Sequence, residues 1–313
     1  MLFSFIIPCY GSEKSIPGVI GEIYDVMAQR KEYDFEIIAV NDKSPDNVYS
    51  VLKELTKHYD KLTVVDLSKN MGKHSAVMAG MSVSRGEFIV NLDDDGQCPM
   101  DRLWELYDAC GEEYDIVMAH YPEKKQSAFK NFGSSVNSAV SHWLLDKPKE
   151  LYFSNFGIVR RYVVDELLKY DNPYPYLEGL ILRITRRITT VEMEERERSD
   201  GKKGHFTLKK SIDLFMNGFT AFSVKPLRVA TLMGFLCSLA GFLYGIYIVV
   251  NKLVHPDVPI GYSSMMAVMI FIGGIIMLIL GMIGEYVGRI YICINKSPQY
   301  VIREVYSSEN AKK

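Results

Sequence analysis

The chain has 313 residues and a formal net charge of -2, so it is long enough for one large domain or two smaller ones. It has no overall basic field, which argues against nucleic acid as a partner. Its five cysteines lack the paired spacing of a metal site. The N-terminus reads as a strand rather than a signal segment, which favours a reducing, cytoplasmic setting for the N-terminal part.

Strands and helices alternate along the first two thirds of the chain. Short apolar runs predict strands, and apolar residues at helical spacing predict helices. This alternation is typical of an α/β fold with a parallel, doubly wound sheet. Strands are predicted at residues 2–8, 35–40, 62–67, 88–92, 115–119, 152–159 and 188–193, and helices at 15–30, 48–59, 74–84, 100–110, 127–145, 163–170 and 177–183.

Three consecutive carboxylates, Asp93 to Asp95, follow the strand predicted at residues 88–92 and precede Gly96. Ligands of open α/β sheets bind beyond the carboxyl ends of the strands. The mutual repulsion of three carboxylates would be offset by a divalent cation with oxygen ligands. An acidic surface turn explains these residues equally well when they are considered alone.

The turns after the first three strands carry polar residues as well: Tyr10 and Glu13, then Asp42, then Lys73. In a parallel sheet these turns and the acidic turn share one edge, which suits a nucleotide site. Neither a Gly-x-Gly-x-x-Gly nor a Walker-type sequence is present, so a dinucleotide cofactor or an ATPase is disfavoured. A diphosphate bound here would need a metal and basic side chains.

The C-terminal third has a different character. Residues 207–223 suit an amphipathic helix in the membrane interface, with a packed core helix as the alternative. Residues 229–250 and 258–284 contain no charged side chain, and each run can span the hydrocarbon core. Positive residues flank the two spans, which predicts both termini on the cytoplasmic side of the inner (plasma) membrane. Several glycines in the second span fit close packing of the two spans or an oligomer contact.

Four blocks of sequence resemble the polyprenyl-phosphate glycosyltransferases of family 2, which have the GT-A fold and include bactoprenol glucosyltransferases and dolichol-phosphate mannose synthases. The first two blocks are the Phe-Ile-Ile-Pro-Cys-Tyr sequence at 5–10 with Glu13, and the strand and turn at 37–46. The third is Asn-Met-Gly-Lys at 70–73 followed by Asp-Asp-Asp-Gly-Gln at 93–97. The fourth is the Ile-Gly-Glu-Tyr-Val-Gly-Arg-Ile-Tyr sequence at 283–291.

This resemblance implies roles for the matching residues and a metal cofactor, Mg²⁺ or Mn²⁺. Pro8, Tyr10, Glu13 and Asp42 would line the nucleotide, with Lys73 beside them. Asp93 and Asp95 would be the Asp-x-Asp carboxylates, with Asp95 as the more direct metal ligand and Asp94 pointing elsewhere. Gln97 would lie near the sugar or acceptor, and Arg198 would reach the diphosphate. Four basic residues near the membrane could hold the lipid phosphate or simply flank the spans: Lys209, Lys210, Lys225 and Arg228.

The resemblance also implies the reaction, an inverting transfer of a sugar from a nucleotide sugar, UDP-linked, to a polyprenyl phosphate. One departure is Asn155, where many bacterial members have Asp. A phosphate monoester with a second pKa of about 6 needs no base to become a nucleophile, so this loss is tolerable. Residues 201–208 are one residue longer than the corresponding family sequence.

Together these observations predict a catalytic domain at residues 1–206, an interface helix at 207–224, a two-helix membrane domain at 225–290 and a cytoplasmic tail at 291–313. Two alternatives stay open. The acceptor could be another membrane lipid, such as a diacylglycerol or ceramide. The chain could also be a catalytically silent membrane scaffold that binds nucleotide sugar, although Asp93, Asp95 and Lys73 argue against this.

Overall fold

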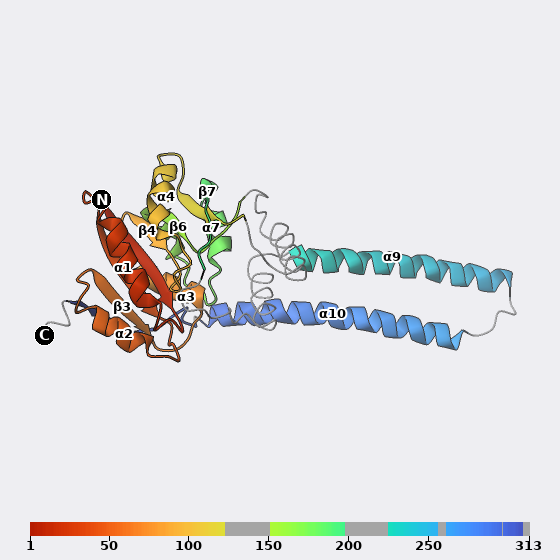
Figure 1. Ribbon diagram of the computed structural model, residues 1–313. Helices are drawn as coiled ribbons and strands as arrows, with labels where there is room; N and C mark the ends of the chain where they lie inside the picture. Colours follow the sequence, from red (N-terminus) through yellow and green to blue (C-terminus); the bar gives the residue numbers. More distant parts are fainter. Residues whose placement is uncertain (123–150, 198–224, 256–260, 296, 309–313) are drawn as a thin grey trace. The chain divides into compact units, whose positions relative to one another are not determined.

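The computed structural model describes residues 1–122, 151–197, 225–255, 261–295 and 297–308 (Figure 1). The chain divides into two compact units, Met1–Ser211 with Lys296–Lys313, and Ile212–Asn295. The first unit contains the β-sheet, and the second contains two long helices. The helices predicted at residues 127–145 and 207–223 lie outside the described residues.

The sheet has eight strands in the order β7-β5-β6-β4-β1-β2-β3-β8. Its centre, β4-β1-β2-β3, is parallel, and β5 pairs with β7 in parallel. Strand β6 is antiparallel to both of its neighbours, and β8 is antiparallel to β3. The predicted α/β fold with a mostly parallel sheet is therefore confirmed. The strands are β1 (Leu2–Cys9), β2 (Asp34–Asn41), β3 (Leu62–Leu67), β4 (Phe88–Asn91), β5 (Ile116–His120), β6 (Gly157–Arg160), β7 (Ile188–Glu192) and β8 (Ile302–Ser307).

Helices cover both faces of β1, which explains why its apolar residues run without alternation. Phe3 and Phe5 belong to a core that also includes residues of α1, α2 and α4. Ile6 faces α3 so closely that a Cβ added to Gly80 would lie 2.5 Å from its side chain. The helices of this unit are α1 (Ile16–Met27), α2 (Val48–Leu55), α3 (Lys73–Val83), η1 (Met100–Arg102), α4 (Leu103–Cys110), α6 (Arg161–Leu167) and α7 (Leu177–Ile184).

Some element boundaries differ from those predicted. Helix α2 ends at Leu55 rather than at residue 59, and the strand predicted at 152–159 begins only at Gly157. Before Gly157 the Ser154 hydroxyl donates to the carbonyl of Phe156 at 2.8 Å, a local bond that competes with strand pairing. At Gly157 a Cβ would lie 2.7 Å from the carbonyl oxygen of Val117, so β6 approaches β5 closely.

The sequence analysis predicts no strand within the tail at residues 291–313, whereas the structure forms strand β8 there. It pairs with β3 in the register Thr63↔Ser307 to Asp66↔Glu304 and closes that edge of the sheet. Glu304 accepts hydrogen bonds from the Tyr49 hydroxyl at 2.6 Å and from the Lys53 ammonium at 3.1 Å, which fastens β8 to α2. The C-terminal segment is thus part of the first unit.

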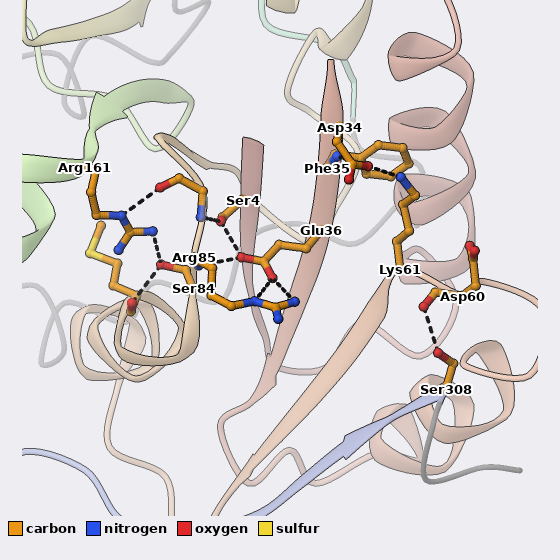
Figure 2. A network of polar contacts seen from close by, with 12 residues as sticks. Ser4, Asp34, Phe35, Glu36, Asp60, Lys61, Ser84, Arg85, Arg161 and Ser308 are labelled. Carbon is orange, nitrogen blue, oxygen red and sulfur yellow. Dashed lines mark hydrogen bonds and ion pairs between the residues drawn. The ribbon is translucent and has the colours of Figure 1, made fainter. Parts of the chain in front are cut away.

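A polar network joins β1 and β2 near their N-terminal ends (Figure 2). The buried carboxylate of Glu36 accepts from the Ser4 hydroxyl at 2.7 Å and from the backbone and guanidinium of Arg85 at 2.6 to 3.1 Å. The Ser4 hydroxyl also accepts from the N–H of Gly86 at 2.7 Å. The partners satisfy a carboxylate that would otherwise be costly to bury, and they lock the turn between α3 and β4 against the sheet.

Helices α9 (Lys225–Val254) and α10 (Tyr262–Ile294) are long and apolar enough to cross a membrane. The windows Ala230–Tyr247 and Phe271–Ile294 have mean hydropathies of 1.6 and 1.9, and only 6% and 0% of their residues are buried. Core helices of a soluble protein would be mostly buried, so the exposure favours contact with lipid. A Cβ added at Gly273, Gly281 or Gly284 would meet nothing within 4 Å among the described residues, so close packing of these glycines is not observed there.

Candidate active site

The turns that follow β1, β2 and β4 are joined by direct hydrogen bonds. The backbone N–H of Tyr10 donates to a carboxylate oxygen of Asp94 at 2.9 Å, linking the first turn to the acidic turn. The N–H of Gly11 donates to the Ser44 hydroxyl at 2.8 Å, linking the first turn to the second. The expectation that these turns share one edge of the sheet is therefore confirmed.

The turn after β3 joins the same group through Asp42 and Lys73. The two oxygens of the buried Asp42 carboxylate accept from the N–H groups of Met71 at 2.7 Å and Gly72 at 2.9 Å. Burial raises the pKa of Asp42, while these two donors act in the opposite direction. Gly72 has a φ of +84°, which a glycine adopts without strain, and it brings Lys73 to the start of α3. Asp42 thus positions the loop that carries Lys73.

Lys73 forms an ion pair with Asp93, across the turns after β3 and β4. The other Asp93 oxygen accepts from the side-chain amide of Asn155 at 2.9 Å, and the Asp93 N–H contacts the sulfur of Cys98 at 3.4 Å. The Asp93 side chain is 23% exposed and that of Lys73 is 42% exposed. Asp93 therefore lies at the mouth of the site with a cation on one side and an amide on the other.

The carboxylate of Asp94 has a different partner from that of Asp93, the backbone N–H of Tyr10. Besides the Tyr10 bond, its backbone carbonyl accepts from the Ser15 hydroxyl at 2.6 Å. Burial raises the pKa of its carboxyl to about 6, and the hydrogen bond from the Tyr10 N–H limits that rise. Asp94 therefore braces the acidic turn against the first turn.

Asp95 is buried, and one of its oxygens accepts from the N–H of Gln97 at 3.1 Å. The Gln97 side-chain amide donates to the carbonyl of Arg196 at 3.2 Å, and the Arg196 N–H donates back to the Gln97 carbonyl at 3.1 Å. These bonds fasten the segment after β7 to the acidic turn. Arg196, two residues before Arg198, pairs with Glu22 at 2.6 Å and Asp101 at 2.5 Å.

A pocket lies beside Asp93. Pro8, Val77, Met118 and Ile181 give it apolar walls, and the polar groups around it come from Lys73, Asp93, Asn155 and Glu178. Asn91 also lines this pocket, and its side-chain oxygen is buried without a hydrogen-bond partner among the described residues. A pocket with apolar walls and a few convergent polar groups is the usual form of a small-molecule site.

His74 lines the same pocket and is the second residue of α3. Burial, and secondly the charge of Lys73, lowers its pKa to about 4. Its ring lies 5.8 Å from the Tyr176 ring in an edge-to-face arrangement. This ring contact with Tyr176 gives His74 a packing role at the start of α3. Its neutral ring at physiological pH can also face a bound ligand.

The acidic turn offers carboxylate oxygens to a divalent cation. Within the described ranges, no three His, Cys, Asp or Glu side chains are grouped to hold a metal ion by themselves. Mg²⁺ is commonly held by one or two carboxylates together with substrate phosphates, rather than by a cage of protein ligands. Asp93 and Asp95 supply two such carboxylates on one turn, so the residues fit a cation whose shell is completed by substrate oxygens.

The other predicted site residues have different outcomes. Tyr10 is exposed, and Glu13 accepts from the N–H of Asn47 at 3.0 Å, tying the first turn to the second. Arg228 is exposed on α9, and Lys225 begins that helix, so both belong to the second unit. Arg198, Lys209 and Lys210 lie outside the described residues.

Two features of the site were missed by sequence reasoning. The Ser44 hydroxyl accepts a hydrogen bond from the Gly11 N–H and donates one to Asp46 at 2.5 Å. Glu178 of α7 lines the pocket. Ser44 follows Asp42 in a polar turn, so its position was a usable signal. Glu178 has no such signal, because its place in the pocket depends on the packing of α7 beside the acidic turn, 85 positions earlier in the sequence.

The chain was compared with known protein families. Residues 4–168 match the model of the family Glycosyl transferase family 2, and residues 225–290 match the GtrB C-terminal hairpin. The first match spans more than half of the chain and contains the four turns of the site. The second covers α9 and most of α10.

Similar proteins align over almost the whole chain. The uncharacterized glycosyltransferase YkcC of Bacillus subtilis (strain 168) is 32% identical over 99% of this chain and 96% of its own length. The undecaprenyl-phosphate 4-deoxy-4-formamido-L-arabinose transferase of Proteus mirabilis (strain HI4320) is 27% identical over 99% and 95%. The prophage bactoprenol glucosyl transferase homolog of Escherichia coli (strain K12) is 27% identical over 97% and 99%.

Among solved structures, the glucosyl-3-phosphoglycerate synthase of Mycobacterium tuberculosis is similar in fold. Its complex with uridine diphosphate matches with a TM-score of 0.50 and 14% identity, over 69% of this chain and 78% of that one. Its complex with Mn²⁺, uridine diphosphate and phosphoglyceric acid matches with a TM-score of 0.50 and 15% identity, over 74% and 78%. At this identity the likeness establishes the fold alone.

Proposed function

Because the chain belongs to glycosyl transferase family 2, we propose that it transfers a sugar from a UDP-sugar to a polyprenyl phosphate, undecaprenyl phosphate. The product would be a lipid-linked sugar that serves as a donor for cell-envelope glycans. The observation that carries the proposal is the meeting of Lys73, Asp93 and Asp95 at the edge of the sheet where four turns converge. Relatives named for undecaprenyl-phosphate and bactoprenol substrates align along nearly the entire chain, hairpin included.

The donor would bind across the turns after β1, β2 and β3. Tyr10 and Pro8 are available to the nucleotide, while Asp42 and Glu13 hold the surrounding loops in place. Lys73 is the cation of the site and would offset the charge of the diphosphate. Asp93 and Asp95 would hold Mg²⁺ or Mn²⁺, which when bound neutralises charge that develops on the leaving diphosphate. Arg198 and Gln97 are the further candidates for contact with donor or sugar.

The acceptor phosphate would act as its own nucleophile. One phosphate oxygen attacks the anomeric carbon, the bond from that carbon to the diphosphate oxygen breaks, and the nucleoside diphosphate leaves with the bonding electrons. A phosphate monoester is largely ionised near neutral pH, so no side chain has to remove a proton. Asn155 is compatible with this chemistry, because its amide orients Asp93 rather than acting as a base.

The membrane would present the acceptor. We infer that α9 and α10 cross the inner membrane and that both termini are cytoplasmic, since positive residues lie outside the two apolar runs. Lys209, Lys210, Lys225 and Arg228 are candidates for attracting the lipid phosphate. The proposed organisation is a catalytic part at 1–206, an interface segment at 207–224 and a membrane hairpin at 225–290, with residues 302–307 returning to the catalytic sheet.

The test is a transfer assay with purified full-length protein, labelled UDP-sugars, Mg²⁺ or Mn²⁺, and undecaprenyl phosphate. We expect label in the lipid-linked fraction, lost on addition of EDTA and lost in Asp95→Asn. The matched control is Asp60→Asn, which should leave transfer unchanged. Asp60 lies in the loop before β3, 35 positions before Asp95 in the sequence. Label on diacylglycerol instead of the polyprenyl lipid, or donor binding without turnover, would contradict the proposal. Full activity of Asp95→Asn would refute the role of the acidic turn.

A further inference from the structure

The strand β8 brings a basic residue to the end of β3. The chain reaches this strand only after α10, more than 230 residues beyond β3 in sequence. Arg303, its second residue, forms an ion pair with Asp66. The Asp66 side chain is 1% exposed, whereas that of Arg303 is 47% exposed. The guanidinium therefore reaches inward from an edge strand to a carboxylate that is otherwise enclosed.

Asp66 needs this cation because a buried carboxylate without a positive partner is costly. Its other oxygen accepts from the side-chain amide of Asn41 at 2.6 Å. Asn41 is the last residue of β2, immediately before Asp42, and its own side chain is buried. The Arg303–Asp66 pair thus helps to fix the side chain of Asn41, the residue at which β2 ends and the second turn begins.

Asn41 passes this constraint to the turns of the proposed donor site. Its side-chain oxygen accepts from the N–H of Ser44 at 3.1 Å. The Ser44 hydroxyl in turn accepts from the N–H of Gly11 at 2.8 Å. A continuous set of contacts therefore runs from β8 through the ends of β3 and β2 to the turn after β1. Each step is an ion pair or a hydrogen bond with a buried or partly buried partner.

We propose that Arg303 is a positioning residue for donor binding, and that the segment after the apolar hairpin completes the nucleotide site. This rests on the proposed function, because it takes the turns at 10–13 and 41–46 as the nucleotide site. Arg303 acts through Asp66 and Asn41 and does not touch the donor. Its loss leaves the Asn41 amide as the one described partner of the Asp66 carboxylate. The Asp66 side chain is then less constrained, and so is the Asn41 side chain that accepts from the Ser44 N–H.

The experiment uses full-length protein with Arg303→Met and Arg303→Lys, and it measures the UDP dissociation constant by calorimetry together with KM and kcat for the UDP-sugar. We expect Arg303→Met to raise both the dissociation constant and KM about tenfold, as for loss of a charged hydrogen bond, with kcat within twofold of wild type. Arg303→Lys keeps the charge and should recover most of the affinity. If Arg303→Met does not fold, Arg303→Gln, which is neutral but can still donate a hydrogen bond, replaces it, and the same rise in the UDP dissociation constant relative to Arg303→Lys is expected.

The matched control is Glu304→Gln, on the next residue of β8. It weakens the contacts of β8 with Tyr49 and Lys53 but leaves Asp66 paired. We expect it to lower thermal stability while leaving UDP affinity within twofold. Unchanged UDP affinity in Arg303→Met, or an equal loss in Glu304→Gln, overturns the positioning role alone, provided the wild type binds UDP and transfers sugar. A wild type that does neither overturns the proposed function and this inference together.

Discussion

Asn155 donates a hydrogen bond to Asp93 at 2.9 Å, on the side of that carboxylate opposite Lys73. The two residues are 62 positions apart and meet because Asn155 precedes β6, which pairs with β4. The carboxylate that follows β4 is therefore held by a cation from the turn after β3 and by a neutral amide from the segment before β6. This arrangement makes the identity of residue 155 decisive for the charge of the site.

We predict that Asn155→Asp lowers kcat/KM for the UDP-sugar more than Asn155→Ala does. The aspartate places a second carboxylate next to Asp93, where like charges disfavour ionisation of both groups and compete for Lys73. The alanine variant only loses a hydrogen bond to a partly exposed carboxylate, for which we expect a loss of about tenfold or less. Steady-state kinetics on both variants provide the measurement. An aspartate variant as active as wild type would show that a second carboxylate beside Asp93 does not disturb the site, and an alanine variant as active as wild type would show that the amide has no role in orienting Asp93.

Much of the sheet could be predicted because the apolar pattern of each central strand agrees with its buried place in the sheet. The strand predicted at 62–67 is observed at Leu62–Leu67, where an apolar run is bounded by polar turns and buried on both faces. Strand β8 could not be predicted in this way. It is a half-exposed edge strand that carries Arg303 and Glu304, and its partner β3 lies far away in the sequence. Its stability comes from that distant pairing rather than from its own composition.

In the candidate site, too, part of the arrangement could be predicted from the sequence and part could not. The shared edge of the four turns followed from the alternation of strands and helices, so the proximity of Lys73 to Asp93 was within reach of sequence reasoning. The side-chain partners were not. Asp42 was expected to line the nucleotide, yet its carboxylate accepts from two backbone N–H groups of the next turn. Such partners depend on loop conformation, which glycine at 72 permits but does not specify.

We predict that Lys73→Met lowers kcat/KM by about a hundredfold. The substitution removes the cation that pairs with Asp93 and that would face the diphosphate, so a charge-assisted contact is lost on two sides. Lys69→Met, an exposed lysine in the same loop, is the matched control and should remain within twofold of wild type. Equal effects in the two variants would mean that Lys73 contributes only to the general field of the loop.

We predict that Gly86→Ala destabilises the protein by about 3 kcal/mol or more. A Cβ at this position would lie 2.5 Å from the Ser4 hydroxyl, 2.7 Å from the Ser4 nitrogen and 2.9 Å from the Leu2 carbonyl oxygen. Two of these atoms belong to the backbone of the central strand β1 and cannot move without disturbing the sheet.

Thermal denaturation of the full-length protein in detergent measures this effect. Gly18→Ala is the comparison, because a Cβ there meets nothing within 4 Å and alanine favours a helix such as α1 by about 0.5 to 1 kcal/mol. We therefore expect opposite signs for the two substitutions. A Gly86→Ala protein with wild-type stability would show that the turn between α3 and β4 can shift away from β1.

Finally, His74 should contribute a pH-dependent component of stability. Burial lowers its pKa from 6.5 to about 4 in the folded chain, so between those values the unfolded state binds the proton and the folded state does not. Stability from this residue is therefore present above pH 6.5, falls as the pH drops toward 4, and is constant below that. Since the residue is partly exposed at the pocket, we expect the change to be about 2 kcal/mol or less.

His74→Phe keeps an aromatic ring against Tyr176 but cannot titrate. Denaturant unfolding of both proteins at a series of pH values from 4 to 8 measures this effect, and the free energy of unfolding of the wild type minus that of the variant should decrease as the pH falls from 7 to 4. Parallel curves over the whole range would mean that His74 is protonated as readily in the folded chain as in the unfolded one.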